Sequence, residues 1–147
     1  MKRGSPFIAC IALALILAAC GAAEPQAGVI LSGTISTDNA EAAEVFLQVS
    51  DDGQTITMTR AHFVKIDCDG YRGGEATFEH TNVKAPIEAG KFEFEASFGQ
   101  VSGQFTSPTA AKGTIHLLFN DGKTECGTCD WSAAGQGVSS WPTRPSP

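Results

Sequence analysis

The sequence predicts an all-β fold: a single antiparallel β-sandwich, jelly-roll-like, of about eight strands, with a small closed β-barrel as the alternative. Three observations predict this class. Apolar residues come in short runs that alternate with polar residues, turn signals recur at intervals of about 8 to 12 residues, and no stretch carries a helical stripe. Glycine, which turns accept readily, occurs 16 times.

The strand-like runs follow one another with clear turns between them. Phe92 and Phe94 alternate with charged residues, so one face of that strand is apolar and the other is solvated. Asp52-Gly53 is a hairpin signal, and Asp121-Gly122 repeats it, because glycine adopts positive φ without penalty. Only residues 38–43 favour a helical turn, and they are too few for a helical layer. The other expected strands are residues 29–37, 45–49, 55–59 and 114–119, with strand-like segments at Phe78, at Phe105, and at Trp131 and Ala133.

Residues 1–19 are predicted to be a signal peptide. Lys2 and Arg3 precede an uninterrupted apolar run at residues 7–19, which ends in two small alanines. A membrane-spanning helix needs about 20 apolar residues, so this run is too short to cross a bilayer. We therefore expect the segment to direct export and then to be removed.

The residues Leu17-Ala18-Ala19-Cys20 resemble the lipobox of bacterial lipoproteins. The resemblance implies that Cys20 becomes the first residue of the mature chain and carries acyl chains such as palmitate. Two or more acyl chains anchor a protein stably, because each buried methylene contributes roughly 0.8 kcal/mol. By the same resemblance, Gly21 after the cysteine implies the outer membrane of the cell envelope where the organism has one.

Composition divides the mature chain into three parts. Residues 20–28 carry no bulky apolar residue and are expected to form a lipid-anchored linker. Residues 29–134 are the expected domain, and residues 135–147, rich in proline and serine, are an expected disordered tail. The net charge of −6 becomes −8 when Lys2 and Arg3 leave with the signal peptide. This acidic balance argues against nucleic acid as a partner.

The second half of the chain carries, in order, Pro86-Ile87, Gly90, Phe92, Phe94, Gly103-Gln104-Phe105, Ala111-Lys112-Gly113-Thr114-Ile115, Cys126, Trp131 and Ala133. This order of glycines, aromatic residues and a late cysteine is similar to a type of uncharacterised exported bacterial β-sandwich domain. The similarity implies a fold, and it implies no activity.

Three cysteines remain in the domain, and an oxidising compartment predicts one disulfide and one thiol. We expect Cys68 to pair with Cys126, because such a bond joins strands far apart in the sequence; pairing of Cys68 with Cys129 is the alternative. Cys129 shares strand parity with Trp131 and is expected to be a buried thiol. Cys126 and Cys129 also form a Cys-x-x-Cys motif, but no helix follows it to activate a thiolate.

Other chemistry-bearing residues form no recognisable site, and we expect no metal and no cofactor. His62, His80 and His116 lie on separate strand-like segments without a zinc-binding spacing. The aspartates at positions 51, 52, 67 and 69 lack the ligand alternation of a calcium loop and suit turns better. Glu93 and Glu95 are about 7 Å apart by strand rise, which is within the range for paired hydrolase carboxylates. Alternating acids on a solvated strand are the commoner case.

These observations predict a membrane-anchored, extracytoplasmic lipoprotein whose domain is a non-enzymatic binding or structural module. Its loops or one sheet face would bind a glycan or a protein. The alternative is an enzyme: a thiol oxidoreductase that uses Cys126 and Cys129, or a carboxylate-dependent hydrolase that uses Glu93 and Glu95. A third hypothesis is a purely structural role in the envelope.

Overall fold

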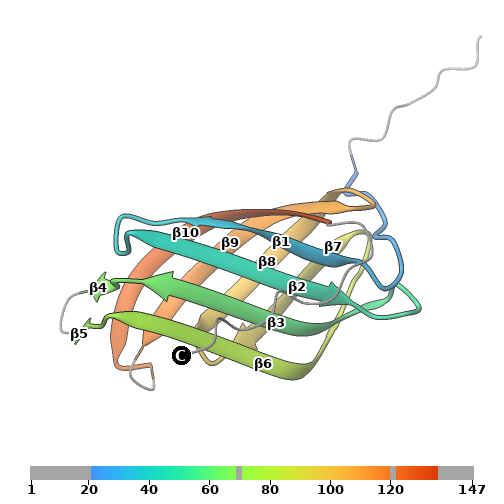
Figure 1. Cartoon of the computed structure of the whole chain (residues 1–147). Helices are drawn as coiled ribbons and strands as arrows, with labels where there is room; N and C mark the ends of the chain where they lie inside the picture. The colour runs from blue at the N-terminus through green and yellow to red at the C-terminus, as the bar shows by residue number, and fades with distance from the viewer. Residues whose placement is uncertain (1–20, 69–70, 120–121, 136–147) are drawn as a thin grey trace, which may run out of the picture.

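The computed structural model describes residues 21–68, 71–119 and 122–135, where every regular element is a β-strand (Figure 1). The predicted signal peptide, Cys20, Asp69 and the tail beyond Gly135 lie outside the described residues. Within those ranges, no helix is long and apolar enough to span a bilayer. The strands are β1 Ile30–Ser36, β2 Ala42–Val49, β3 Thr55–Val64, β4 Asp67–Cys68, β5 Tyr71–Arg72, β6 Glu75–Pro86, β7 Lys91–Ala96, β8 Gly99–Ser107, β9 Ala110–Phe119 and β10 Thr124–Gly135.

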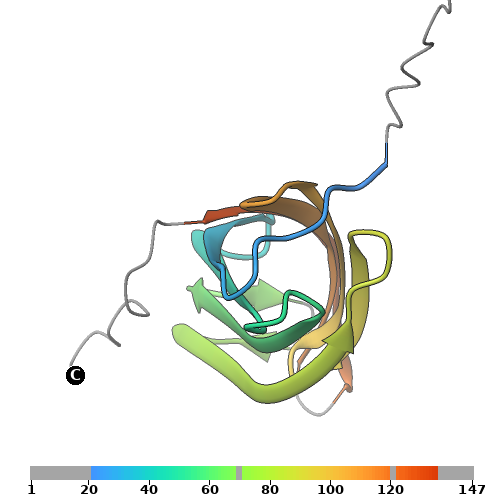
Figure 2. The same cartoon turned by 90° about the vertical axis from the view of Figure 1, so that its right-hand side faces the viewer.

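Eight of these strands form one antiparallel sheet in the order β6-β3-β2-β1-β10-β9-β8-β7. Strand β1 pairs with both β2 and β10, so the two ends of the domain sequence meet and the sheet curls on itself (Figure 2). Strands β6 and β7 do not pair along their lengths, and between them Glu88 and Lys91 form an isolated bridge in the turn. The result is a nearly closed barrel with one seam.

The all-β prediction is confirmed, and of the two expected architectures the barrel is the one observed. A jelly roll needs connections that cross between two sheets. Here each strand of the large sheet pairs with its neighbour in sequence, apart from the seam, and no crossover occurs among the described strands. The pairing of β1 with β10, from Leu31 opposite Gly135 to Ser36 opposite Asp130, closes the sheet.

The barrel interior is filled by apolar side chains from alternate positions of each strand. Aromatic rings form two groups, one toward each end. In the first group the ring centroids are 5.3 to 6.2 Å apart, and its members are Phe63, Phe78, Phe98 and Phe119. The second group comprises Phe92, Phe94, Phe105 and Trp131. Edge-to-face and tilted contacts of this kind add to the stabilisation from burial.

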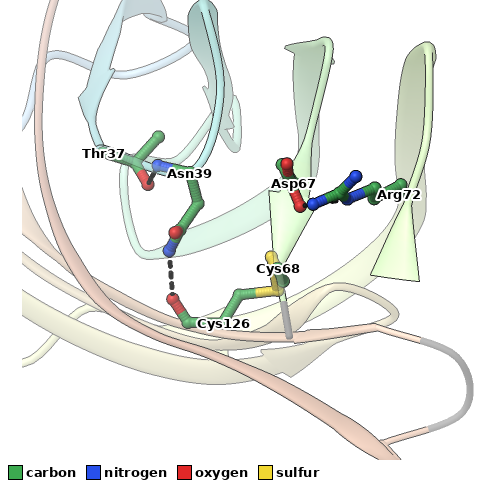
Figure 3. Close-up of a disulfide and its surroundings, with 6 residues drawn as sticks. All are labelled: Thr37, Asn39, Asp67, Cys68, Arg72 and Cys126. Carbon is green, nitrogen blue, oxygen red and sulfur yellow. Dashed lines mark hydrogen bonds and ion pairs between the residues drawn. A yellow bond between two sulfur atoms is a disulfide. The ribbon is translucent and has the colours of Figure 1, made fainter. Parts of the chain in front are cut away.

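A further segment of the chain lies at each end of the barrel. At one end, here named the disulfide end, β4 and β5 form a short hairpin, and Cys68 is bonded to Cys126 of β10 (Figure 3). At the opposite end, the strap end, residues 21–28 run along the rim and hydrogen-bond to it; we name this segment the strap. Figure 1 shows the hairpin at the left and the strap, in blue, at the right.

A β-bulge in β10 determines which of its side chains face the interior. The register with β9 shifts between Glu125 and Gly127, and Gly127 has a φ of 83°. As a result Cys126 and Cys129 are both buried, although simple alternation would put residues three apart on opposite faces. The bulge thus lets one cysteine form the disulfide while the other stays in the core.

Replacing Gly127 by alanine is expected to lower the free energy of unfolding by about 1 to 2 kcal/mol, because an L-residue is strained at positive φ. A Cβ atom there meets nothing within 4 Å, so crowding makes no contribution. Gly74→Ala is the matched control, since its Cβ is equally free and its φ is outside the left-handed region. The control should change stability by less than about 0.5 kcal/mol. Chemical denaturation measures both, and equal effects would contradict the role of the bulge.

Candidate binding site

The outer face of the barrel carries a broad, open depression of about 1070 Å³. It extends across β7, β8, β9, β10 and β1, and Pro86 at the end of β6 and Glu88 in the turn that follows contribute to its border. Its lining positions alternate with core positions: on β9, Lys112 and Thr114 line the depression, whereas Ile115 is fully buried in the interior. The surface is therefore built on strands that the core holds rigidly in place.

Two glycines on neighbouring strands contribute bare backbone to the floor of the depression. Gly103 is paired with Gly113, which is paired on its other side with Trp131. The indole of Trp131 is buried beneath them and donates its Nε1–H to the Ser102 carbonyl oxygen at 3.1 Å. A Cβ at Gly103 would lie 2.5 Å from Cζ2 of Trp131 and from Cζ of Phe92. The absence of side chains here lets the rings fill the interior.

Apart from Pro86 and the buried rings of Phe92 and Trp131, the side chains of the depression are hydroxyls, one amide and charges of both signs. The hydroxyls of Ser102 and Thr114 bond to each other at 2.9 Å, and Gln104 supplies the amide. The charged residues are Glu88, Lys91, Glu93, Lys112 and Asp130. Such a lining offers donors and acceptors without a strong net charge, so it suits a polar ligand better than a highly charged one.

Comparison with known proteins assigns no family. No family model matches the chain, and no curated protein is significantly similar to it. The function must be inferred from the depression and from the placement of the residues that carry chemistry.

The expected disulfide between Cys68 and Cys126 is confirmed (Figure 3). Its two Cα atoms are 5.3 Å apart, and the residues are 58 apart in the sequence. Asn39 Nδ2 donates to the Cys126 carbonyl oxygen at 2.7 Å, which ties the β1–β2 turn to the same end. Cys129 is a free, buried thiol. Because Cys126 is bonded to Cys68, the two cysteines of the Cys-x-x-Cys motif do not form a dithiol pair.

The three histidines lie apart on different strands. On the outer face of β3, His62 Nδ1 lies 2.8 Å from the Thr77 hydroxyl, and on β9, His116 Nδ1 lies 3.1 Å from the Thr128 hydroxyl. His80 is on β6, with Nδ1 buried. Among the described residues, no group of three or more His, Cys, Asp or Glu side chains is placed to hold a metal ion.

The acids considered at the sequence level are also separated. Asp51 and Asp52 lie in the β2–β3 turn at the strap end, whereas Asp67 is in β4 at the disulfide end. Glu93 and Glu95 are both exposed on β7, but only Glu93 lines the depression, and its carboxylate accepts a hydrogen bond from the side-chain amide Nε2 of Gln100. The two glutamates therefore do not face a shared cleft.

The sequence alone did not predict the depression. Its strands are recognisable, but the surface depends on β1 lying beside β10, and these strands are at opposite ends of the domain sequence. One local signal was available: Gly103 and Gly113 interrupt two strand-like runs, and glycine inside a strand often marks close approach of another group.

Proposed function

We propose that this chain is a lipid-anchored, extracytoplasmic binding protein that holds a glycan in the depression of its barrel wall. The observation that carries the binding role is the depression itself, about 1070 Å³ in volume and lined by polar side chains on a packed sheet. The signal-peptide pattern and the lipobox-like residues ending at Cys20 support the location in the cell envelope.

The shape of the depression favours an extended ligand. Neighbouring strands are 4.7–4.9 Å apart, so five strands span about 20 Å. An open surface of that length accepts a chain of sugar units that continues beyond the protein, which an enclosed pocket would not. Hydroxyls such as Thr34 and Ser132, together with Gln104, can exchange hydrogen bonds with sugar hydroxyls and amides.

The composition of the depression argues against a protein partner. Protein–protein interfaces are enriched in aromatic residues and depleted in Lys, Glu, Asp and Ser. Here those four residue types supply half of the lining residues, and the two aromatic residues at its floor, Phe92 and Trp131, are only 4% and 3% exposed. The pattern is the reverse of a typical protein-binding patch.

The enzyme hypotheses receive less support. A thiol oxidoreductase needs an accessible thiolate, but Cys126 is in a disulfide with Cys68, and Cys129 is buried. A hydrolase of the paired-carboxylate type needs both acids on the substrate, but Glu95 does not line the depression. A binding role needs neither an accessible thiolate nor a pair of carboxylates on the ligand.

The lipidated protein in detergent is expected to co-sediment with an insoluble envelope glycan, tested with isolated peptidoglycan sacculi and a panel of neutral polysaccharides. Gln104→Ala and Asp130→Asn should each weaken binding about five- to tenfold, because the first removes a side-chain amide and the second replaces a charged acceptor oxygen by an NH2 donor, and a hydrogen bond is worth about 1 kcal/mol. Both side chains are solvent-accessible, so folding should be unaffected.

Lys123→Ala is the matched control, since Lys123 is exposed at the disulfide end and does not line the depression. It should bind as the unaltered protein does. Absence of binding to every glycan in the panel, or equal losses in Lys123→Ala and Gln104→Ala, would refute the proposed role of the depression.

A further inference from the structure

We infer that the strap end of the barrel lies directly against the membrane surface, so that the depression opens sideways, parallel to the bilayer. This inference rests on the proposed function, because it takes Cys20 as the lipidated residue. It goes further in stating which end of the fold faces the lipid and what kind of lipid surface it fits.

The strap is held along the rim by hydrogen bonds to two loops and a strand. The N–H of Ala23 donates to the Phe105 carbonyl oxygen at 2.9 Å, and that of Gln26 donates to the Pro108 carbonyl oxygen at 2.7 Å. Further along, the N–H of Gly28 donates to the Ser50 carbonyl oxygen at 2.8 Å. A segment expected from composition to be a linker is therefore part of the barrel from residue 23 onward.

Close packing against the β6–β7 turn also fixes the strap. Gly90 has a φ of 73°, and a Cβ on it would lie 2.3 Å from the Ala23 carbonyl oxygen and 2.9 Å from the Ala22 carbonyl carbon. Gly90 also accepts a hydrogen bond from the N–H of Phe105, at 2.8 Å, so strap, turn and β8 meet at one point. Ala23 is packed against the hydrophobic core.

The length of chain between the anchor and this point is short. Ala23 follows Cys20 by three residues, and a fully extended chain covers about 3.3–3.6 Å per residue, or about 10 Å in all. The strap end must then stay within about 10 Å of the lipid-bearing residue. The ten-residue strands β3 and β9 reach about 30 Å toward the other end, so the disulfide end points away from the membrane.

The charge of the strap end indicates which lipid surface it fits. Four acidic residues lie on the strap and on the turns beside it, and one exposed lysine lies with them, so this group has a net charge of −3: Glu24, Asp51, Asp52, Glu88 and Lys91. The Ser50 hydroxyl and the Gln54 N–H donate to the Asp52 carboxylate and hold the pKa of Asp52 below its usual value, because they stabilise the ionised form. Screening acts over about 8 Å, similar to the available reach, so anionic lipid would repel this end. A zwitterionic lipid surface would not repel the strap end.

The orientation can be tested by quenching in the lipidated protein, reconstituted in phosphatidylcholine vesicles that contain some nitroxide-headgroup lipid. Thr109→Cys at the strap end and Lys123→Cys at the disulfide end carry a fluorophore; both positions are exposed, and Cys129 is buried from the reagent. Quenching at position 109 should be several-fold stronger than at position 123. Replacing part of the phosphatidylcholine with an anionic lipid should reduce the quenching at 109.

Insertion of 12 Gly/Ser residues between Gly21 and Ala22 adds about 20 Å of flexible reach and should bring the quenching at 109 down to that at 123. The same insert after Pro147 is the control and should change nothing. Equal quenching at both positions in the unaltered chain, or stronger quenching at 123, overturns the orientation and leaves the anchor intact. Intact mass without acyl chains, with the protein absent from the vesicles, overturns the proposed function and this inference with it.

Discussion

Replacing Cys68 and Cys126 together by alanine is expected to lower the free energy of unfolding by about 4 kcal/mol. The bond joins residues 58 apart, and closing a loop of that length removes this much conformational freedom from the unfolded chain. Small domains have a total stability of only about 5–15 kcal/mol, so the loss is a large fraction of the whole. Equilibrium denaturation with and without reductant measures it, since reduction of the unaltered protein should reproduce most of the effect.

Cys129→Ala is the matched control, because Cys129 is as buried as the bonded cysteines but takes no part in the bond. It should cost only about 1 kcal/mol, from the lost packing of one small side chain. Thiol labelling adds a second check: the unreduced mature protein should expose one thiol, and only after unfolding. A double variant no less stable than Cys129→Ala would contradict a stabilising disulfide.

The effect should concentrate at the disulfide end. Strands β4 and β5 have two residues each, which is too short to be stable without support. Cys68 bonds β4 to β10, and the N–H of Asp67 donates to the Asn39 carbonyl oxygen at 2.8 Å. Amide exchange in the double variant should therefore increase first in β4 and β5, before the paired strands of the barrel open.

The parts of the fold that could be predicted from the sequence are those that depend on near neighbours. Alternation at Phe92 and Phe94 identifies β7, and the Asp52-Gly53 pair identifies the β2–β3 hairpin, where Gly53 has a φ of 76°. Residues 38–43, weighed as a helical turn, divide between a short turn at 38–41 and the first two residues of β2. No helix forms there.

Features that depend on distant residues could not be predicted in this way. Short strands with polar outer faces fit a sandwich or a barrel equally well, and only the contact of β1 with β10 selects the barrel. The strap has no bulky apolar side chain, so its composition is that of a linker. It is held by backbone hydrogen bonds, such as that from the Ala23 N–H to the Phe105 carbonyl oxygen. Almost any residue type can make such bonds, so the sequence does not reveal them.

Gly113→Ala is expected to lower the free energy of unfolding by about 3 kcal/mol, the upper part of the usual range for overpacking. A Cβ there would lie 1.9 Å from the Ser102 carbonyl oxygen and 2.6 Å from the Gly103 Cα, so it would meet backbone on the adjacent strand. Backbone cannot rotate away as a flexible side chain does. The clash is therefore relieved only if β8 and β9 separate, which weakens their pairing from Val101–Ile115 to Phe105–Ala111.

Separation of β8 and β9 should also disturb Trp131 and the binding surface. The indole reaches across β9 to donate to the Ser102 carbonyl oxygen, so movement of that oxygen breaks the bond and should shift the tryptophan fluorescence. Lys112→Ala, at the neighbouring outward position, is the control and should stay within about 0.5 kcal/mol of the unaltered protein. If Gly113→Ala is as stable as Lys112→Ala, the two strands are not in close contact at this point. Because bare backbone at residues 103 and 113 also contributes to the floor of the depression, the proposed glycan binding should fall in Gly113→Ala even at temperatures where it remains folded.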